Sequence, residues 1–244
     1  MGDVVQVWKI PLQVSSKASS SLDQLLSTYL ACLSPDEKDK ANRFRFPVDR
    51  RRFAITRGTL RHLIARQLDQ KPEEVTFCYG TYGKPAIDLS TRPLRRAFVG
   101  AECSFHFNLS HSGEIALCAL GYKRIVGIDI EKVRSIKRLE SMMKRTLVER
   151  EQRQVRSQAM PARAFLQRWT CKEAYLKAIG LGLTQSMQTV EVQTDPPKLL
   201  KVPEDCAEGW HLHLIDLPEG YVGALAVEGA ATVTQHSWQH SWQH

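Results

Sequence analysis

The stretch Ile125-Val126-Gly127-Ile128-Asp129-Ile130-Glu131 combines the pattern of a β-strand with two acidic side chains. Because side chains point alternately to the two faces of a strand, its even-numbered apolar residues share a face that suits a protein core. The opposite face carries Gly127, Asp129 and Glu131. Two carboxylates about 6.5 Å apart repel by roughly 2.5 kcal/mol at an effective dielectric constant of about 20. A partly dry site on this face therefore calls for a cation.

The two acids of this strand are candidate ligands for a divalent metal ion. Carboxylate oxygens suit Mg²⁺, which takes one or two carboxylates together with the phosphates of a substrate. Gly127 would leave room for the ligand on the same face. The alternative is an edge strand whose outer face is solvated, and the strand by itself favours neither interpretation.

A second acidic candidate lies on a helix expected from Pro161 to Ile179, since a proline suits the first turn and Gly180 the end. Within this helix Glu173 and Lys177 are one turn apart, so a carboxylate and an ammonium group point the same way. An ordinary ion pair on the helix surface is the alternative.

The segment Phe107-Asn108-Leu109-Ser110-His111-Ser112-Gly113 sets a histidine among hydroxyl groups in a tight turn between two expected strands. The glycine frees backbone amides, and a loop of this kind can receive a phosphate group. A solvated loop histidine is the alternative for His111.

Basic residues outnumber acidic ones, with 34 Lys and Arg against 26 Asp and Glu and a formal net charge of +8. Residues 43–66 hold eight arginines against one acid, Asp49, and residues 132–145 hold six basic residues against Glu140. Such clusters attract polyanions, whether nucleic acid, nucleotide phosphates or an acidic protein. The charge balance excludes an acidic-tail protein. For any single arginine, the alternative to a binding role is an ordinary solvated position on the surface.

The chain has no recognisable signal for secretion or membrane insertion. Its first residues include Asp3 and no long apolar region, and the longest apolar run, Ile115 to Leu120, is about a third of a membrane helix. The six cysteines are far apart, without the paired spacing of a zinc site or the density of a disulfide framework. We expect a cytoplasmic protein with reduced thiols and no membrane partner.

Strands and helices are mixed in both parts of the chain, which is an α+β pattern. Short connections within residues 105–131 favour an antiparallel meander of three strands. Helices are expected over residues 21–33, 36–42, 49–68, 136–158 and 161–179, and further strands over residues 4–10, 75–79, 187–192, 210–215 and 221–227. We divide the chain into an N-terminal half, 1–104, a C-terminal half, 105–234, and a tail, 235–244, whose repeated His-Ser-Trp-Gln unit receives no assigned role.

Four segments together resemble the ordered motifs of the Sfp-type phosphopantetheinyl transferases. They are residues 107–112, residues 127–131, Trp169-Thr170-Cys171-Lys172-Glu173-Ala174-Tyr175-Leu176-Lys177, and Gly180-Leu181-Gly182-Leu183, and an earlier Gly83-Lys84-Pro85 also matches. One motif alone would be weak, but their correct relative placement is highly specific. The resemblance implies a monomer of two similar α+β halves, a pseudo-dimer in one chain, with the active site between the halves.

The resemblance also implies a reaction. The enzyme would move the phosphopantetheinyl arm of coenzyme A to a serine hydroxyl of an acyl or peptidyl carrier protein and release adenosine 3',5'-bisphosphate. By the same resemblance, Asp129, Glu131 and Glu173 would ligate Mg²⁺. Glu173 would also take the proton of the serine, and Lys177 would contact the diphosphate and assist the leaving group together with His111.

Further positions carry over to the nucleotide end of coenzyme A. Ser110 and His111, with Arg52 and Lys40, would hold phosphates of the nucleotide. Lys84-Pro85 would lie along the adenine, largely through the backbone. A carrier protein is expected to be acidic, so the basic stretch Lys132 to Arg145 is the candidate docking surface.

Two other functions fit part of the pattern. A basic nucleic-acid-binding module would explain the arginines but leaves the acidic face of residues 125–131 unexplained. Another Mg²⁺-dependent phosphate enzyme, such as a kinase or a nucleotidyltransferase, is less favoured because Gly80-Thr81-Tyr82-Gly83-Lys84 lacks the spacing of a P-loop. We expect coenzyme A and a carrier protein as partners, and no nucleic acid.

Overall fold

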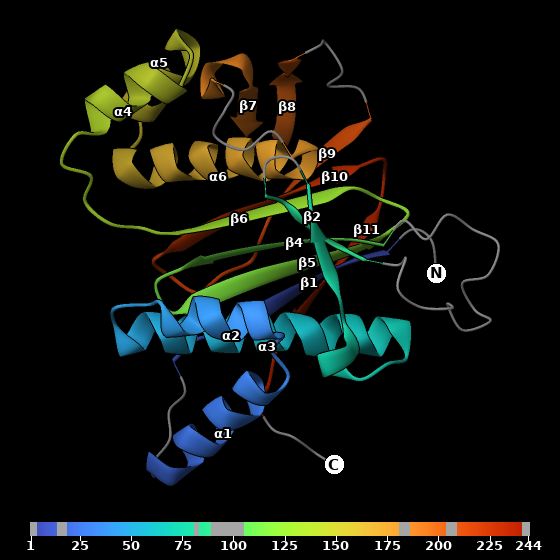
Figure 1. The fold of residues 1–244 in the computed structure, drawn as a ribbon. Coiled ribbons are helices and arrows are strands. Elements are labelled where there is room, and N and C mark those ends of the chain that lie inside the picture. The colour runs from blue at the N-terminus through green and yellow to red at the C-terminus, as the bar shows by residue number, and fades with distance from the viewer. Residues whose placement is uncertain are drawn as a thin grey trace.

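The computed structural model describes residues 4–13, 19–80, 83–88, 105–180, 186–203 and 209–240. Two stacked β-sheets form the middle of the molecule, and helices cover their outer sides (Figure 1). The helices are α1 (Ser19–Ala31), α2 (Pro35–Asn42), α3 (Pro47–Leu68), α4 (Leu139–Thr146), α5 (Glu149–Arg156) and α6 (Pro161–Ile179), with short 3₁₀ turns at Pro72–Glu74 and Met187–Thr189. The α+β class and the organisation into two halves, each with a sheet and helices, are confirmed.

The chain builds most of the first sheet, then the second sheet, and returns to the first with its last strand. The first sheet has the order β11-β1-β5-β4 and contains β1 (Val4–Pro11), β4 (Phe105–Ser112), β5 (Ile115–Tyr122) and β11 (Thr232–Ser237). The second has the order β6-β10-β9 and contains β6 (Val126–Lys132), β9 (Trp210–Leu214) and β10 (Tyr221–Glu228). Two hairpins, β2 (Phe77–Tyr79) with β3 (Pro85–Ile87) and β7 (Glu191–Thr194) with β8 (Pro197–Lys201), lie outside these sheets.

Apolar faces of the two sheets meet in a shared core. Ile128 and Ile130 of β6 cluster there with Val5 and Val7 of β1 and Leu117 of β5, all of them buried. The predicted alternation of the stretch 125–131 is therefore confirmed for its apolar face. On the outer sides, α3 packs against the first sheet and α6 against the second.

The contact between α6 and β6 depends on Gly127. A Cβ atom at this position would collide with the carbonyl oxygen of Ala174 and would lie 2.8 Å from the Cα of Ala178. The backbone of α6 therefore rests directly on β6. The expectation that Gly127 leaves room for a ligand is wrong, because a helix fills that space.

The third strand of the expected meander is also a correction. β4 and β5 pair antiparallel as predicted, but β6 pairs with β10 and belongs to the second sheet. β4 and β6 contact each other through side chains instead, and the side-chain oxygen of Asn108 in β4 accepts the backbone N–H of Ile128 at 2.9 Å. The chain passes from the first sheet to the second between β5 and β6. The boundary near residue 104 falls outside the described residues and stays a prediction.

The expected helix 136–158 is two helices, α4 and α5. Leu147 and Val148 between them have extended backbones, and the carboxylate of Glu151 accepts the N–H of Val148 at 3.0 Å, which starts a new helix. The expected strand 187–192 begins as a 3₁₀ turn. The strands β3, β8 and β11 are additions to the predicted set.

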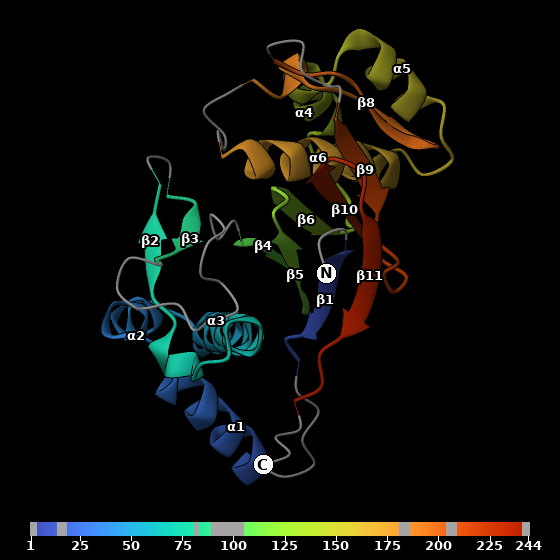
Figure 2. The ribbon, with the colours of Figure 1, turned by 90° about the vertical axis from the view of Figure 1, so that its right-hand side faces the viewer.

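Residues 235–240 of the tail are an integral part of the fold. β11 pairs parallel with β1, beside which it lies in Figure 2. Trp238 is buried, and its Nε1 donates to the hydroxyl of Tyr29 at 2.9 Å. Nδ1 of His240 lies 2.7 Å from the same hydroxyl, and its Nε2 donates to the carbonyl of Pro11 at 2.8 Å. The tail therefore fastens α1 to the first sheet, and the predicted boundary at residue 234 falls inside β11.

Substituting Gly127→Ala should destabilise the protein by at least about 3 kcal/mol, because the new methyl group meets helix backbone rather than a movable side chain. Urea unfolding followed by circular dichroism measures this free energy. Gly83→Ala is the control, since nothing lies within 4 Å of a Cβ there although its φ of +76° adds strain. A Gly127→Ala protein as stable as the wild type would contradict the close packing.

Substituting Trp238→Ala should lower the free energy of unfolding by about 3 to 5 kcal/mol, as expected for emptying a buried aromatic site. The same urea titration measures the change. Gln239→Ala, at the exposed neighbouring position, should leave stability within about 0.5 kcal/mol of wild type. A loss below about 1 kcal/mol for Trp238→Ala would show that the tail is dispensable for folding.

Candidate active site

Alternate side chains of β4 connect this strand to β6. Asn108 accepts a hydrogen bond from the backbone N–H of Ile128. The Ser110 hydroxyl donates to Asp129 Oδ1 at 2.8 Å, and the Ser112 hydroxyl donates to Glu131 Oε2 at 3.0 Å. These residues share one face of β4 because side chains on a strand repeat every second position. The hydroxyl groups orient both strand acids from outside their own sheet.

Lys177 joins the helix to this pair of strands. Its Nζ lies 2.6 Å from Asp129 Oδ1 and 2.9 Å from the Ser110 hydroxyl, and it also donates to the carbonyl of Ile128 at 3.3 Å. Since α6 rests on β6 at Gly127, a side chain in the last turn of the helix reaches the strand acids. Lys177 thus forms an ion pair between helix and strand, and the alternative of an ordinary surface ion pair within the helix does not describe its contacts.

Glu173 lies on the same helix and is 7% exposed. Burial raises the pKa of its carboxyl group, the negative charges of Asp129 and Glu131 raise it further, and Lys177 opposes them. Burial likewise raises the pKa of Glu131, with a smaller contribution from Asp129. The three predicted acids therefore feel one another's charge, as expected for groups that converge on one region.

Two oxygen atoms of these acids are suited to a cation. Asp129 Oδ2 and Glu173 Oε1 are buried without a hydrogen-bond partner, and an unpaired buried carboxylate oxygen is costly unless a ligand completes it. Within the described ranges no three His, Cys, Asp or Glu side chains form a ready-made metal cage. Mg²⁺ does not need one, because it keeps waters and substrate phosphates in its coordination shell. The residues present thus fit the ion.

Two cationic side chains, Arg52 and Lys177, lie near His111. Burial lowers the pKa of His111 on β4, and the nearby charges of Arg52 and Lys177 lower it further. Arg52 of α3 forms ion pairs with Glu114, in the turn after β4, and with Asp49 at 3.5 Å. Side chains from both halves therefore surround the space next to His111, as needed to bind a polyanion.

The other residues predicted at the nucleotide end lie elsewhere. Lys40 is exposed on α2, with its Nζ 5.5 Å from the ring centre of Phe53. Lys84 donates from its Nζ to the carbonyl of Ala178 at 2.6 Å, and Pro85 pairs with Tyr79 in the hairpin β2–β3. None of these contacts, all between described residues, reaches Ser110, Asp129 or Lys177. The roles of Lys40, Lys84 and Pro85 stay predictions, and Leu181, Gly182 and Leu183 of the last motif are outside the described residues.

Sequence reasoning missed several residues that build the site. Glu114 holds Arg52 and keeps its Oε2 buried without a partner. Its backbone N–H is bonded to the hydroxyl of Tyr221 at 3.1 Å. The position of Glu114 directly after the Ser-His-Ser-Gly turn is the signal that would have found it.

Lys172 lies within the motif 169–177 and has contacts that the sequence does not predict. It is 0% exposed, and its Nζ donates to Glu151 Oε2 at 2.6 Å and to the carbonyls of Thr146 and Met187 at 2.9 and 3.2 Å. It therefore ties α6 to α4, α5 and the following turn, and points away from the neighbouring Glu173. A buried lysine beside an acid in a helix pattern gives no hint of this long-range partner.

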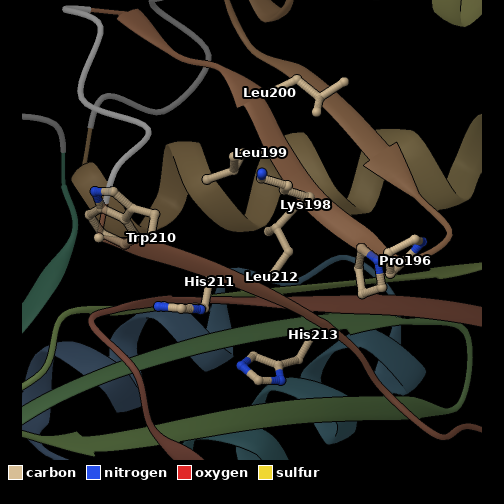
Figure 3. A pocket seen from close by; sticks show the side chains of 10 residues that line it. Pro196, Lys198, Leu199, Leu200, Trp210, His211, Leu212 and His213 are labelled. Atoms are coloured by element: carbon tan, nitrogen blue, oxygen red, sulfur yellow. The ribbon is translucent and has the colours of Figure 1, made fainter.

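One hollow of the surface lies on another part of the molecule. Figure 3 shows Trp210, His211 and His213 of β9 beside Lys198 and Leu199 of β8. None of the predicted site residues lines it.

Among the described residues, none of the helices is long and apolar enough to span a lipid bilayer.

Two family models and several known proteins are similar to this chain. Residues 125–226 match the model of the 4'-phosphopantetheinyl transferase superfamily, and residues 19–121 match the N-terminal model of 4'-phosphopantetheinyl transferases. The 4'-phosphopantetheinyl transferase HetI of Nostoc sp. is 38% identical, with 100% of this chain and 93% of that protein covered. A putative 4'-phosphopantetheinyl transferase of Synechocystis sp. is 33% identical over 74% of this chain and 70% of its own length.

A solved structure of a holo-(acyl-carrier-protein) synthase from Bacillus anthracis, in complex with CoA (3',5'-ADP), is 28% identical. It covers 43% of this chain and 96% of its own chain, with a TM-score of 0.36. Matches to both family models and an identity of 38% over the whole chain establish the relationship. The chain belongs to the 4'-phosphopantetheinyl transferase superfamily.

Proposed function

We propose that the cluster of Ser110, Asp129, Glu131, Glu173 and Lys177 is the catalytic centre of this phosphopantetheinyl transferase, which uses coenzyme A to activate carrier proteins. The observation that carries the proposal is the pair of buried carboxylate oxygens, Asp129 Oδ2 and Glu173 Oε1, that lack a partner. A serine hydroxyl of an acyl or peptidyl carrier protein attacks the phosphorus that carries the pantetheine arm. The bond from this phosphorus to the bridging oxygen breaks, and adenosine 3',5'-bisphosphate leaves.

Asp129, Glu131 and Glu173 would hold Mg²⁺, whose chemistry when bound is to neutralise charge on the diphosphate oxygens. Glu173 accepts the proton of the attacking serine hydroxyl, directly or through a water molecule. A pKa raised by burial and by neighbouring acids makes its carboxylate a stronger base than an exposed glutamate. Removing that proton leaves the nucleophile negatively charged as the new bond forms.

Lys177 stabilises the negative charge that develops on the leaving oxygen. His111 supports it by hydrogen bonding, because its lowered pKa keeps the imidazole neutral at neutral pH. Ser110 and Arg52 hold the nucleotide phosphates, with Lys40 as an outer contact and the backbone of Lys84-Pro85 along the adenine. Coenzyme A thus spans from the N-terminal half to β6 and α6.

The carrier protein docks, in this proposal, on the basic segment 132–145. Lys132, Arg134, Lys137, Arg138, Lys144 and Arg145 are exposed in this segment. Its apolar residues Val133, Ile136, Leu139 and Met142 pack inward around the buried Met143. An acidic partner would therefore be recognised by charge, on a surface that continues from the end of β6.

We propose that the enzyme acts as a cytoplasmic monomer without nucleic-acid or membrane partners. Free thiols at Cys32, Cys78, Cys118 and Cys171 agree with a reducing compartment. The direct test of the function is intact mass spectrometry of apo carrier proteins of fatty acid, polyketide and nonribosomal peptide synthesis, each incubated with the protein, coenzyme A and Mg²⁺. We expect one member to gain a single phosphopantetheinyl group, and no gain on any of them would argue against the proposal.

Substituting Glu173→Gln should reduce the transfer rate by at least about a hundredfold, because the proton acceptor is lost. The metal-free protein should become more stable at pH 8, since one of three mutually repelling acids is neutral. Because the pKa of Glu173 is higher in the folded state than in the unfolded state, the folded state binds more protons. The free energy of unfolding of the wild type therefore falls as the pH rises from the unfolded pKa through the folded pKa of this group. Thermal unfolding in EDTA at pH 5 and pH 8 measures this, together with the mass-based transfer assay.

The control for this variant is Asp23→Asn, which neutralises an exposed acid on α1, outside both the acidic cluster and the docking segment 132–145. It should change neither the transfer rate nor the pH dependence of unfolding by a measurable amount. Normal transfer by the Glu173→Gln protein would remove this residue from the mechanism.

Reversing charge in the docking segment with Lys137→Glu and Arg138→Glu should slow association with an acidic carrier by about tenfold at low salt. The effect should shrink at high salt because mobile ions screen exposed charges. Stopped-flow association rates at two ionic strengths measure it. Lys198→Glu with Lys201→Glu, two exposed positions on β8, is the matched control, and an equal loss there would contradict a specific docking surface.

A further inference from the structure

The ammonium group of Lys84 reaches from the N-terminal half to the end of α6. Its Nζ donates to the carbonyl of Ala178 at 2.6 Å, and the Lys84 side chain is half-buried. Its Cδ lies 3.7 Å from the position that a Cβ of Gly180 would occupy. The hairpin β2–β3 stands beside this end of α6 in Figure 2.

The acceptor is a carbonyl that the helix itself leaves open. Ala178 lies in the last turn of α6, where carbonyl groups have no partner four residues further along. The chain turns away at Gly180, whose φ of 78° is left-handed. A cation at this end also interacts favourably with the partial negative charge of the helix terminus. Lys84 therefore both satisfies the carbonyl and stabilises the helix end.

The residue is protonated when it makes this contact. Burial lowers the pKa of Lys84 to about 8, so at neutral pH the ammonium form prevails. A buried ammonium needs a hydrogen-bond acceptor to offset its lost hydration. The carbonyl of Ala178 supplies it.

The hairpin that carries Lys84 is fixed to α3. Arg57 of α3 stacks over the ring of Phe77 at 4.0 Å and donates to the hydroxyl of Tyr79 at 3.1 Å. Phe77 also contacts the ring of Phe107 in β4, with 5.6 Å between ring centres. The hairpin is thus held against α3 and β4, and the bond from Lys84 to Ala178 connects it to α6.

Other contacts of α6 come from the C-terminal half. Gly127 of β6 meets the helix at Ala174 and Ala178, and Lys177 bonds to Asp129 and to Ser110 of β4. Lys172 bonds to Glu151 of α5. Lys84 adds a contact at the helix end from the opposite half, one residue after Lys177.

We propose that Lys84 is a positioning residue that fixes the end of α6 from the N-terminal half and thereby sets the place of Lys177 and Glu173 for the reaction. This inference rests on the proposed function of those two residues. In this proposal the Lys84 side chain binds the end of α6, and only the backbone around Lys84 contacts the nucleotide.

The test compares binding of coenzyme A with the chemical step in a Lys84→Met variant, which keeps an apolar stem without the ammonium group. Titration calorimetry with coenzyme A should give a dissociation constant within about twofold of wild type. The single-turnover transfer rate at saturating coenzyme A should fall by about 10- to 100-fold, because small displacements of reacting groups have effects of that size. Lys84→Arg, which keeps a cationic donor, should recover most of the rate.

The matched control is Lys9→Met. Lys9 also donates from its Nζ to a backbone carbonyl, that of Asp216 at 3.1 Å, but it lies on β1 away from α6. This variant should retain the wild-type transfer rate. Circular dichroism at the assay temperature shows whether each variant is folded. If Lys84→Met is unfolded, the coenzyme A affinity and the transfer rate of Lys84→Arg are compared with those of the wild type instead.

Hydrogen exchange distinguishes this inference from the proposed function. Amides of residues 177–180 should exchange at least about fivefold faster in Lys84→Met than in wild type or Lys9→Met, whether or not any carrier is modified. Faster exchange with no transfer by the wild type would defeat the proposed function alone. A weakened coenzyme A affinity with an unchanged saturated rate, equal losses in Lys84→Met and Lys84→Arg, or unchanged exchange would each overturn the positioning role.

Discussion

The close approach of α6 to β6 is the constraint on which the rest of the site depends. It exists because Gly127 has no side chain, so helix backbone rests where a Cβ would otherwise stand. This contact brings Lys177 to within 2.6 Å of Asp129 and holds Glu173 where it feels the charge of both strand acids. A larger residue would separate helix from strand, and the acidic and basic groups would no longer share one environment.

That environment is costly for the folded protein when no cation is bound. Glu173 and Glu131 are both harder to ionise than exposed glutamates, and buried oxygens of Asp129 and Glu173 have no partner. Unfavourable electrostatics of this kind cluster at functional sites, where a ligand supplies the missing charge. Lys177 offsets part of the repulsion, and the hydroxyls of Ser110 and Ser112 orient the strand acids. The repulsion among these acids therefore lowers the stability of the folded protein, as expected if they are the metal ligands proposed above.

The supporting structure draws on the whole chain. Lys172 secures α6 from α4 and α5 through a buried ion pair with Glu151, while the carbonyl of Ala178 receives Lys84 from the hairpin. At the opposite side of the molecule, Trp238 joins α1 to the first sheet. Residues from both halves thus hold α6 in place, while Ser110, Asp129, Glu131, Glu173 and Lys177 come from β4, β6 and α6.

The order of residues along the chain is enough to predict the local patterns: the alternation of residues 125–131, the one-turn spacing of Glu173 and Lys177, the α+β class and the family motifs. These depend on periodicity and residue type, which are properties of neighbouring positions. The helix that packs on Gly127, the pairing of β6 with β10, and the distant partners of Glu114, Lys172 and Lys84 become visible once the elements are packed together. Such partners are chosen by the packing of whole elements, because a side chain's contacts across 20 or more residues leave no periodic trace in the sequence.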